Sequence, residues 1–180
     1  MTRGVAVNEA YRDLNPPLWV RPAVCHLLET VGKRYLRGLD AVVLTNVGAM
    51  NSQRKRGKLW SRKQKLAFSD CRGIYHPRSQ SQGAWIEVFV DNVFERAASW
   101  VYAIPLLREY YLADTLYHEL GHHIHTLAPE FRGREDVAHA WRMRLVREMF
   151  SMLHPLMWVG KQVRDSSFSR SQKGPKVGTC

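Results

Sequence analysis

The sequence predicts an α+β fold in which a small twisted β-sheet packs on helices. The predicted order is a helix, a strand, short strands and then two helices, so strands and helices do not alternate as they do in βαβ units. Of the 180 residues, 45% are hydrophobic, which is enough for the core of a single domain. We expect this domain to span residues 1–164 and the Ser- and Gly-containing residues 165–180 to form a disordered tail.

The first half of the chain predicts one helix followed by one buried strand. The helix is expected to begin at Arg21-Pro22, because proline suits the first turn, and to end at Gly38. Its apolar residues recur every three or four positions: Val24, Leu27, Leu28, Val31 and Tyr35. Residues 41–47 are mainly β-branched and other apolar residues, so they predict the buried strand.

The middle of the chain predicts a basic loop and two further strands. Residues 51–66 contain seven Lys or Arg residues and Trp60. We expect this loop either to contact phosphates or to be a solvated insertion. Residues 73–76 predict a short strand and residues 84–90 a longer one, with Glu87 facing outward.

The most informative stretch is His118-Glu119-Leu120-Gly121-His122, which has the form H-E-x-x-H. It lies in a predicted helix whose apolar residues recur at helical spacing up to Leu127 and which Pro129 ends. Residues four apart lie on one face of a helix, so both imidazoles can reach one metal ion. Glu119 can then address a water on that ion. The pattern indicates a metal-dependent hydrolase, with a peptidase as the favoured class.

Two residues near the ligands have predicted roles in packing and orientation. Gly121 costs about 1 kcal/mol in a helix interior relative to alanine. This cost makes sense if another backbone passes close to the helix; otherwise the glycine is simply tolerated. Asp114 lies four residues before His118, so we expect it either to orient that histidine or to be an ordinary exposed aspartate.

A third ligand is needed, because catalytic zinc takes three protein ligands and keeps one open position. The favoured candidate is Glu135, in the first turn of a second predicted helix that returns antiparallel to the first. The alternatives are Asp136, His139 and Glu130. His123 and His125 are disfavoured, because their side chains diverge from that of His122 on a helix.

The motif, followed by the E-x-x-A pattern from Glu135 to Ala138, resembles the gluzincins, which are zinc peptidases with a glutamate as third ligand. The short spacing and small size look most like the compact ImmA/IrrE-type zincin peptidases. The resemblance covers roughly residues 85–150. It implies a compact zincin-like fold, Zn²⁺ held by His118, His122 and Glu135, and Glu119 as the general base of a metalloendopeptidase.

One departure from the family's pattern is His139. Thermolysin-like members carry an aspartate at this position, four residues after the ligand glutamate, and compact relatives often carry Asn or Asp. A neutral His139 would still accept a hydrogen bond. A cationic His139 would repel the metal and weaken activity.

The resemblance also implies how the reaction runs. Glu119 would take a proton from the attacking water and pass it to the leaving nitrogen. An oxyanion donor is expected too, and the candidates are His123, His125, His139, Tyr75 and Tyr111. In zincin folds an edge strand beside the metal helix pairs with the substrate, and residues 86–90 are the expected edge strand.

The composition bears on partners and compartment. A net charge of +11 favours acidic protein substrates or polyanions. One alternative function is therefore nucleic-acid binding through the basic loop and tail, and another is a non-catalytic zincin-fold interaction module. Three cysteines without a C-x-x-C pair suit a reducing cytoplasm. We expect no secretory segment and no membrane span, because no apolar core of either kind is present.

Overall fold

A computed structural model of the chain describes residues 4–61, 64–95, 97–129 and 134–151. The chain divides into two compact units, residues 1–149 and residues 150–180. All elements described below belong to the first unit. The predicted tail at 165–180 and the predicted domain boundary at residue 164 lie outside the described residues.

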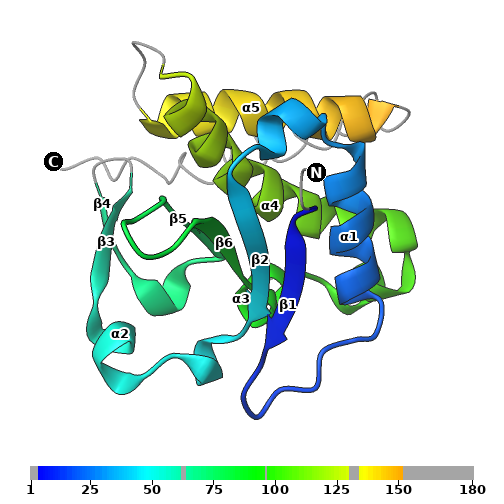
Figure 1. Cartoon of the computed structure of the whole chain (residues 1–180). Helices are drawn as coiled ribbons and strands as arrows, with labels where there is room; N and C mark the ends of the chain where they lie inside the picture. The colour runs from blue at the N-terminus through cyan, green and yellow to red at the C-terminus, as the bar shows by residue number, and fades with distance from the viewer. Residues whose placement is uncertain (1–3, 62–63, 96, 130–133, 152–180) are drawn as a thin grey trace, which may run out of the picture. The chain divides into compact units, whose positions relative to one another are not determined.

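The centre of the first unit is a four-stranded mixed sheet with the strand order β1-β2-β6-β5 (Figure 1). Its strands are β1 (Ala6–Ala10), β2 (Leu39–Thr45), β5 (Gly73–His76) and β6 (Ala84–Phe89). The first three in spatial order run parallel, and β5 is antiparallel to β6. The predicted strands at 41–47, 73–76 and 84–90 are therefore confirmed to within two residues, whereas β1 was not predicted.

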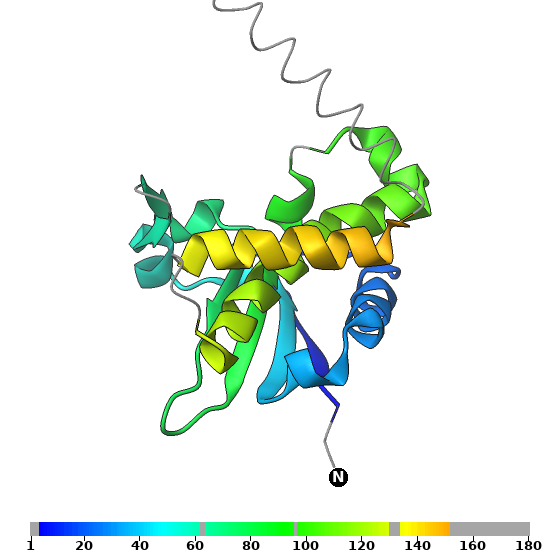
Figure 2. The same cartoon turned by 90° about the horizontal axis from the view of Figure 1, so that it is seen from above.

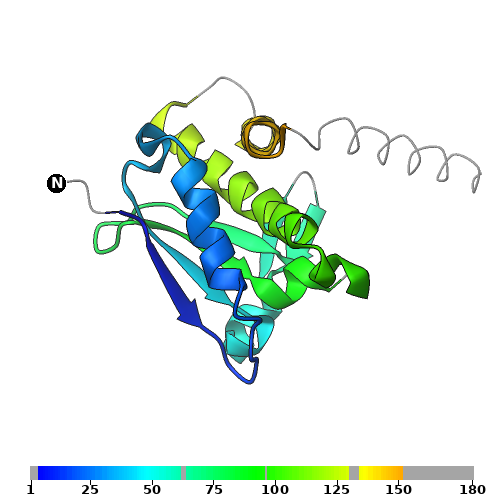
Figure 3. The ribbon, with the colours of Figure 1, turned by 90° about the vertical axis from the view of Figure 1, so that its right-hand side faces the viewer.

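Two α-helices cover one face of this sheet and a third lies outside them. Figure 3 shows α1 and α4 against the sheet and α5 beyond α4, and Figure 2 shows α5 running along this side of the unit. The described helices are α1 (Val20–Thr30), α2 (Ser52–Arg56), α3 (Val90–Phe94), α4 (Pro105–Leu127) and α5 (Arg134–Met149). The described 3₁₀ turns are η1 (Lys33–Leu36), η2 (Val47–Ala49), η3 (Phe68–Asp70) and η4 (Ser99–Ala103).

The helix predicted to end at Gly38 ends earlier. Val31 already has an extended backbone, and the short turn η1 follows it. Gly38 lies after that turn with a φ of +80°, a conformation that glycine adopts readily. Gly38 therefore ends the helical part of the chain just before β2, after η1, and does not cap α1.

The main core lies between the sheet and α4. Val42 and Leu44 of β2 alternate with less buried neighbours, and their buried side chains meet apolar residues of the helices. From α4, side chains at helical spacing enter this core: Leu112, Leu116, Leu120 and Ile124. Pro105 occupies the first turn of α4, where its missing N–H costs nothing. This packing fixes α4 lengthwise across the sheet.

The opposite face of the sheet is also covered, which corrects two predictions. Residues 51–66 are not a loop: they form α2 and the hairpin of β3 (Lys58–Ser61) and β4 (Gln64–Ala67). A second apolar cluster joins Met50, Ile74 and Phe89 on this face. Glu87 therefore does not face solvent; it is buried and bonded to Arg54 and His76.

The architecture is compatible with the predicted α+β class. It does contain one parallel β1–α1–β2 unit that the sequence pattern did not reveal. Within residues 4–151, apart from three short gaps, none of the helices combines the length and the apolar character that a membrane span requires.

Candidate metal centre

Two helices bring three possible metal ligands together. His118 and His122 lie one turn apart on α4, and Glu135 lies in the first turn of α5. The Nε2 atom of His118 is 3.6 Å from Glu135 Oε2, and that of His122 is 3.7 Å from Glu135 Oε1. One donor atom from each of the three residues lies within 4.8 Å of the other two. This group could hold a metal ion.

The distances between the donor atoms, which involve both oxygens of Glu135, leave room for an ion among the three residues. Ligand atoms at about 2.1 Å from a tetrahedral zinc lie roughly 3.4 Å from one another. The distances of 3.6 and 3.7 Å are close to that value, and both exceed a good hydrogen bond. Of the candidate third ligands, the structure brings Glu135 to the histidines; Glu130 lies outside the described residues.

Gly121 explains how α5 comes so close to α4. A β-carbon at this position would lie 2.7 Å from both the α-carbon and the carbonyl oxygen of Ala138. Real β-carbons do not approach backbone atoms that closely, so only glycine allows this contact. The prediction that another backbone passes beside Gly121 is confirmed. Ala138 lies one turn after Glu135, so the same contact sets the position of the third ligand.

The protonation state of His122 suits a metal ligand. Burial, together with the nearby charges of His125 and Arg134, lowers the pKa of His122 to about 4. The imidazole is therefore neutral at neutral pH, with a lone pair available. Its ring and that of His118 are nearly perpendicular, with centroids 4.9 Å apart.

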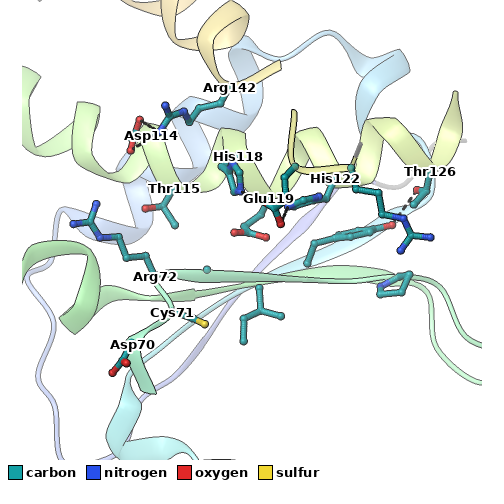
Figure 4. A pocket seen from close by; sticks show the side chains of 16 residues that line it. Asp70, Cys71, Arg72, Asp114, Thr115, His118, Glu119, His122, Thr126 and Arg142 are labelled. Carbon is teal, nitrogen blue, oxygen red and sulfur yellow. Dashed lines mark hydrogen bonds and ion pairs between the residues drawn. The ribbon is translucent and has the colours of Figure 1, made fainter. Parts of the chain in front are cut away.

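Glu119 is buried beneath the two histidines, between α4 and β5 (Figure 4). Burial raises its pKa to about 8, although a hydrogen bond from the backbone N–H of Tyr75 opposes the shift and Glu135 adds to it. A β-carbon at Gly73 would lie 2.7 Å from Glu119 Cγ. Gly73 thus leaves the space that the Glu119 side chain occupies. A dication held by the three ligands would lower this raised pKa.

All four residues open into one cavity of about 750 Å³. Its floor on the sheet side is β5, from Gly73 to Tyr75. Residues 86–90 were predicted as the edge strand, and this prediction is wrong, because β6 pairs with β2 on one side and with β5 on the other. The outer strand beside α4 is β5.

A polar network links α4 and α5 one helical turn away from the ligands. Asp114 accepts a hydrogen bond from Arg142 Nη1, and the two form an ion pair at 3.0 Å. Arg142 Nη2 lies 3.0 Å from His139 Nδ1. A guanidinium can only donate, so His139 Nδ1 accepts and the imidazole is neutral in this arrangement.

Of the candidate oxyanion donors, Tyr75 lines the cavity. Its hydroxyl lies 3.2 Å from His123 Nδ1 and 3.1 Å from Thr126 Oγ1. His123 is buried and lies 3.1 Å from the carbonyl of Arg37, to which it donates from Nε2. His123 therefore supports Tyr75, and His123, His125, His139 and Tyr111 do not line the cavity.

Two residues of this site were not predicted from the sequence. Arg142 lies seven positions after Glu135, on the same face of α5, and this spacing is the signal that could have revealed it. Gly73 opens a short strand, and no local pattern connects it with Glu119. Comparison of the chain with protein-family models, with curated proteins and with solved structures found no match.

Proposed function

We propose that this chain is a zinc-dependent peptidase of zincin-like fold that hydrolyses peptide bonds with Glu119 as general base. The observation that carries the proposal is the convergence of His118, His122 and Glu135 on one point, with a buried carboxylate beside it and a cavity in front. Two imidazoles and one carboxylate form a ligand set typical of catalytic zinc.

The residues of the chain have distinct roles in this proposal. Bound zinc would supply a Lewis acid and a water with a pKa near about 7. Glu119 accepts the proton of the attacking water and delivers it to the leaving amide nitrogen. Its burial keeps other proton donors away, and the Tyr75 N–H holds it in place. The outer edge of β5 lies along the same cavity and would pair with an extended peptide.

The proposal is tested by metal content and hydrolysis measured together. The purified chain is expected to retain about one zinc per molecule and to cleave a mixed peptide library. His122→Ala is expected to lose the metal, whereas Glu119→Gln keeps it and loses cleavage. Full zinc content in His122→Ala would contradict the ligand assignment. Undiminished cleavage by Glu119→Gln would contradict its role as base.

The same measurements separate the two alternative functions. A non-catalytic interaction module would hold zinc but show no water-exchangeable position and no cleavage. A nucleic-acid-binding protein would bind DNA or RNA with an affinity that falls steeply with salt. Arg54, one of the basic residues on which that alternative relied, is already paired with buried Glu87.

A further inference from the structure

The cavity is lined by four acidic residues (Asp70, Asp114, Glu119 and Glu135) and by three arginines, and not every arginine is paired with a carboxylate of the described residues. Three arginines line it: Arg72, Arg134 and Arg142. Arg142 is paired with Asp114. Among the described residues, no carboxylate lies within ion-pair distance of the other two arginines. Arg134 adjoins residues outside the described part of the chain. Arg72 is therefore the arginine considered as a binding site for a substrate.

Arg72 lines the same cavity as the residues proposed to react, just before the start of β5. It directly precedes Gly73, the residue that makes room for Glu119. Its backbone carbonyl accepts a hydrogen bond from the N–H of Phe89, which anchors it at the end of β5. Figure 4 shows its guanidinium on the α4 side of the strand, beyond Thr115 and away from His118 and His122, whereas Asp70 points to the opposite side. The nearest acidic neighbour in sequence therefore does not neutralise it.

We propose that Arg72 selects peptide substrates that carry a carboxylate within two residues of the cleaved bond. The inference rests on the proposed peptidase function and names the substrate class for the same site. A peptide extended along β5 advances about 3.3 Å per residue, so the side chain one or two positions from the reacting carbonyl comes within reach of an arginine. The guanidinium fork matches a carboxylate in a bidentate geometry.

Two sources of this carboxylate are open to experiment. An Asp or Glu side chain would make the chain an endopeptidase with acidic specificity. A free C-terminal carboxylate would restrict it to the last peptide bonds of its substrates. Matched peptides with a free or an amidated C-terminus, each with Asp or Asn near the cleaved bond, distinguish these sources.

The first experiment compares kcat/KM for these matched peptides in the zinc-loaded wild type and three variants. Arg72 is exposed, so a preference of about fivefold for the carboxylate peptide is expected, and added salt should reduce it. Arg72→Gln should remove the preference and Arg72→Glu should reverse it. The control is Arg21→Gln, which changes an exposed arginine of α1 outside the cavity and should keep the preference.

A second experiment separates this inference from the proposed function. Binding of the same peptides, carrying a fluorescent label, is measured by anisotropy in zinc-loaded Glu119→Gln with and without Arg72→Gln. Carboxylate-dependent binding that vanishes with Arg72→Gln supports the inference even if the wild type cleaves nothing. Cleavage or binding that is equal for Asp, Asn, free and amidated peptides overturns it, whether or not the chain is a peptidase. Circular dichroism and zinc content check that each variant is folded.

Discussion

A glutamate is buried on each face of the sheet. The pKa values of these two glutamates, Glu87 and Glu119, are shifted in opposite directions. Glu87 points to the face covered by α2, where Arg54 and His76 bind its carboxylate. Burial alone would raise its pKa, but the hydrogen bonds from His76 and Arg54 and the charge of Arg54 outweigh burial and lower it. Glu119 lies on α4, at the other face of the sheet, where the backbone N–H of Tyr75 donates a hydrogen bond to it. Burial outweighs this hydrogen bond and raises the pKa of Glu119 to about 8.

The difference teaches how to distinguish structural from functional buried charge. A carboxylate that is fully paired at its own site has nothing left to offer a substrate. A carboxylate that is buried without a protein cation, and that opens into a cavity, is poised to take up a proton or to respond to a metal. Substitutions of the two glutamates, and of the glycines beside Glu119 and the ligands, test this difference.

The largest effect is expected from Glu119→Gln. Removing the general base should lower peptidase activity by roughly 10³-fold, while the stability of the metal-free protein at neutral pH should not fall, because a buried carboxyl group with a pKa of about 8 is replaced by a neutral amide of the same shape. Steady-state cleavage and urea unfolding measure the two quantities. The comparison fails if Glu119→Gln lowers the stability of the metal-free protein, or if the variant cleaves as fast as the wild type.

The next largest effect concerns the paired glutamate. Glu87→Gln leaves Arg54 without its partner and should cost roughly 2–4 kcal/mol in the free energy of unfolding, with zinc content unchanged. The control is Glu148→Gln, which breaks the exposed Arg144–Glu148 pair and should leave unfolding unchanged. Urea denaturation of both variants at neutral pH gives the result. Equal stabilities would show that the buried pair contributes nothing.

The lowered pKa of Glu87 also predicts how the free energy of unfolding depends on pH. The pKa of Glu87 is lower in the folded than in the unfolded protein, so its contribution to stability is complete above the ordinary value of about 4.3. That contribution is lost as pH falls through the lowered pKa of the folded state. The difference in the free energy of unfolding between the wild type and Glu87→Gln should therefore stay constant above about pH 4.3 and shrink as the pH falls below that value.

A smaller effect is expected from Gly121→Ala on the Glu119 side. Its β-carbon would displace the backbone of α5 at Ala138 and with it Glu135, so zinc affinity should fall roughly tenfold. Competition with a chelator measures the affinity. Gly32→Ala is the matched control, because its β-carbon would come no closer than 3.5 Å to the Tyr35 ring. Unchanged affinity in Gly121→Ala would show that the helix contact does not set the ligand.

The smallest effect is expected from Gly73→Ala. Its β-carbon would meet side-chain atoms of Glu119 and Thr115, which can shift, so cleavage should fall roughly tenfold while zinc remains bound. Parallel assays of zinc content and cleavage distinguish this variant from Gly121→Ala. Loss of zinc in Gly73→Ala would place the effect on the ligands instead of on Glu119.

The sequence predicted the elements whose signal is local and periodic. The helices α4 and α5 and the strands β2, β5 and β6 follow their apolar patterns, and Glu135 follows from the spacing between two helices. It did not predict β1, which pairs at the edge of the sheet and stays largely exposed, so that no buried alternation marks it.

The remaining errors share one physical cause. The burial of Glu87 and the interior position of β6 depend on which segments far apart in sequence come together. A run of basic residues predicts a solvated segment, because the sequence does not show which distant carboxylate will bind one of them. Here buried Glu87 binds Arg54 of that run. Long-range pairing of this kind leaves no periodic trace in either segment.

The close approach of α4 and α5 has a consequence for finding relatives. Two residues without bulk, Gly121 and Ala138, meet backbone to backbone, and the ligands His122 and Glu135 are carried on the same two turns. A chain that keeps the H-E-x-x-H motif can therefore be searched for a paired small residue seventeen positions after its glycine, even where overall similarity has vanished. Such a pair of small residues would identify the ligand-bearing second helix before any glutamate is compared.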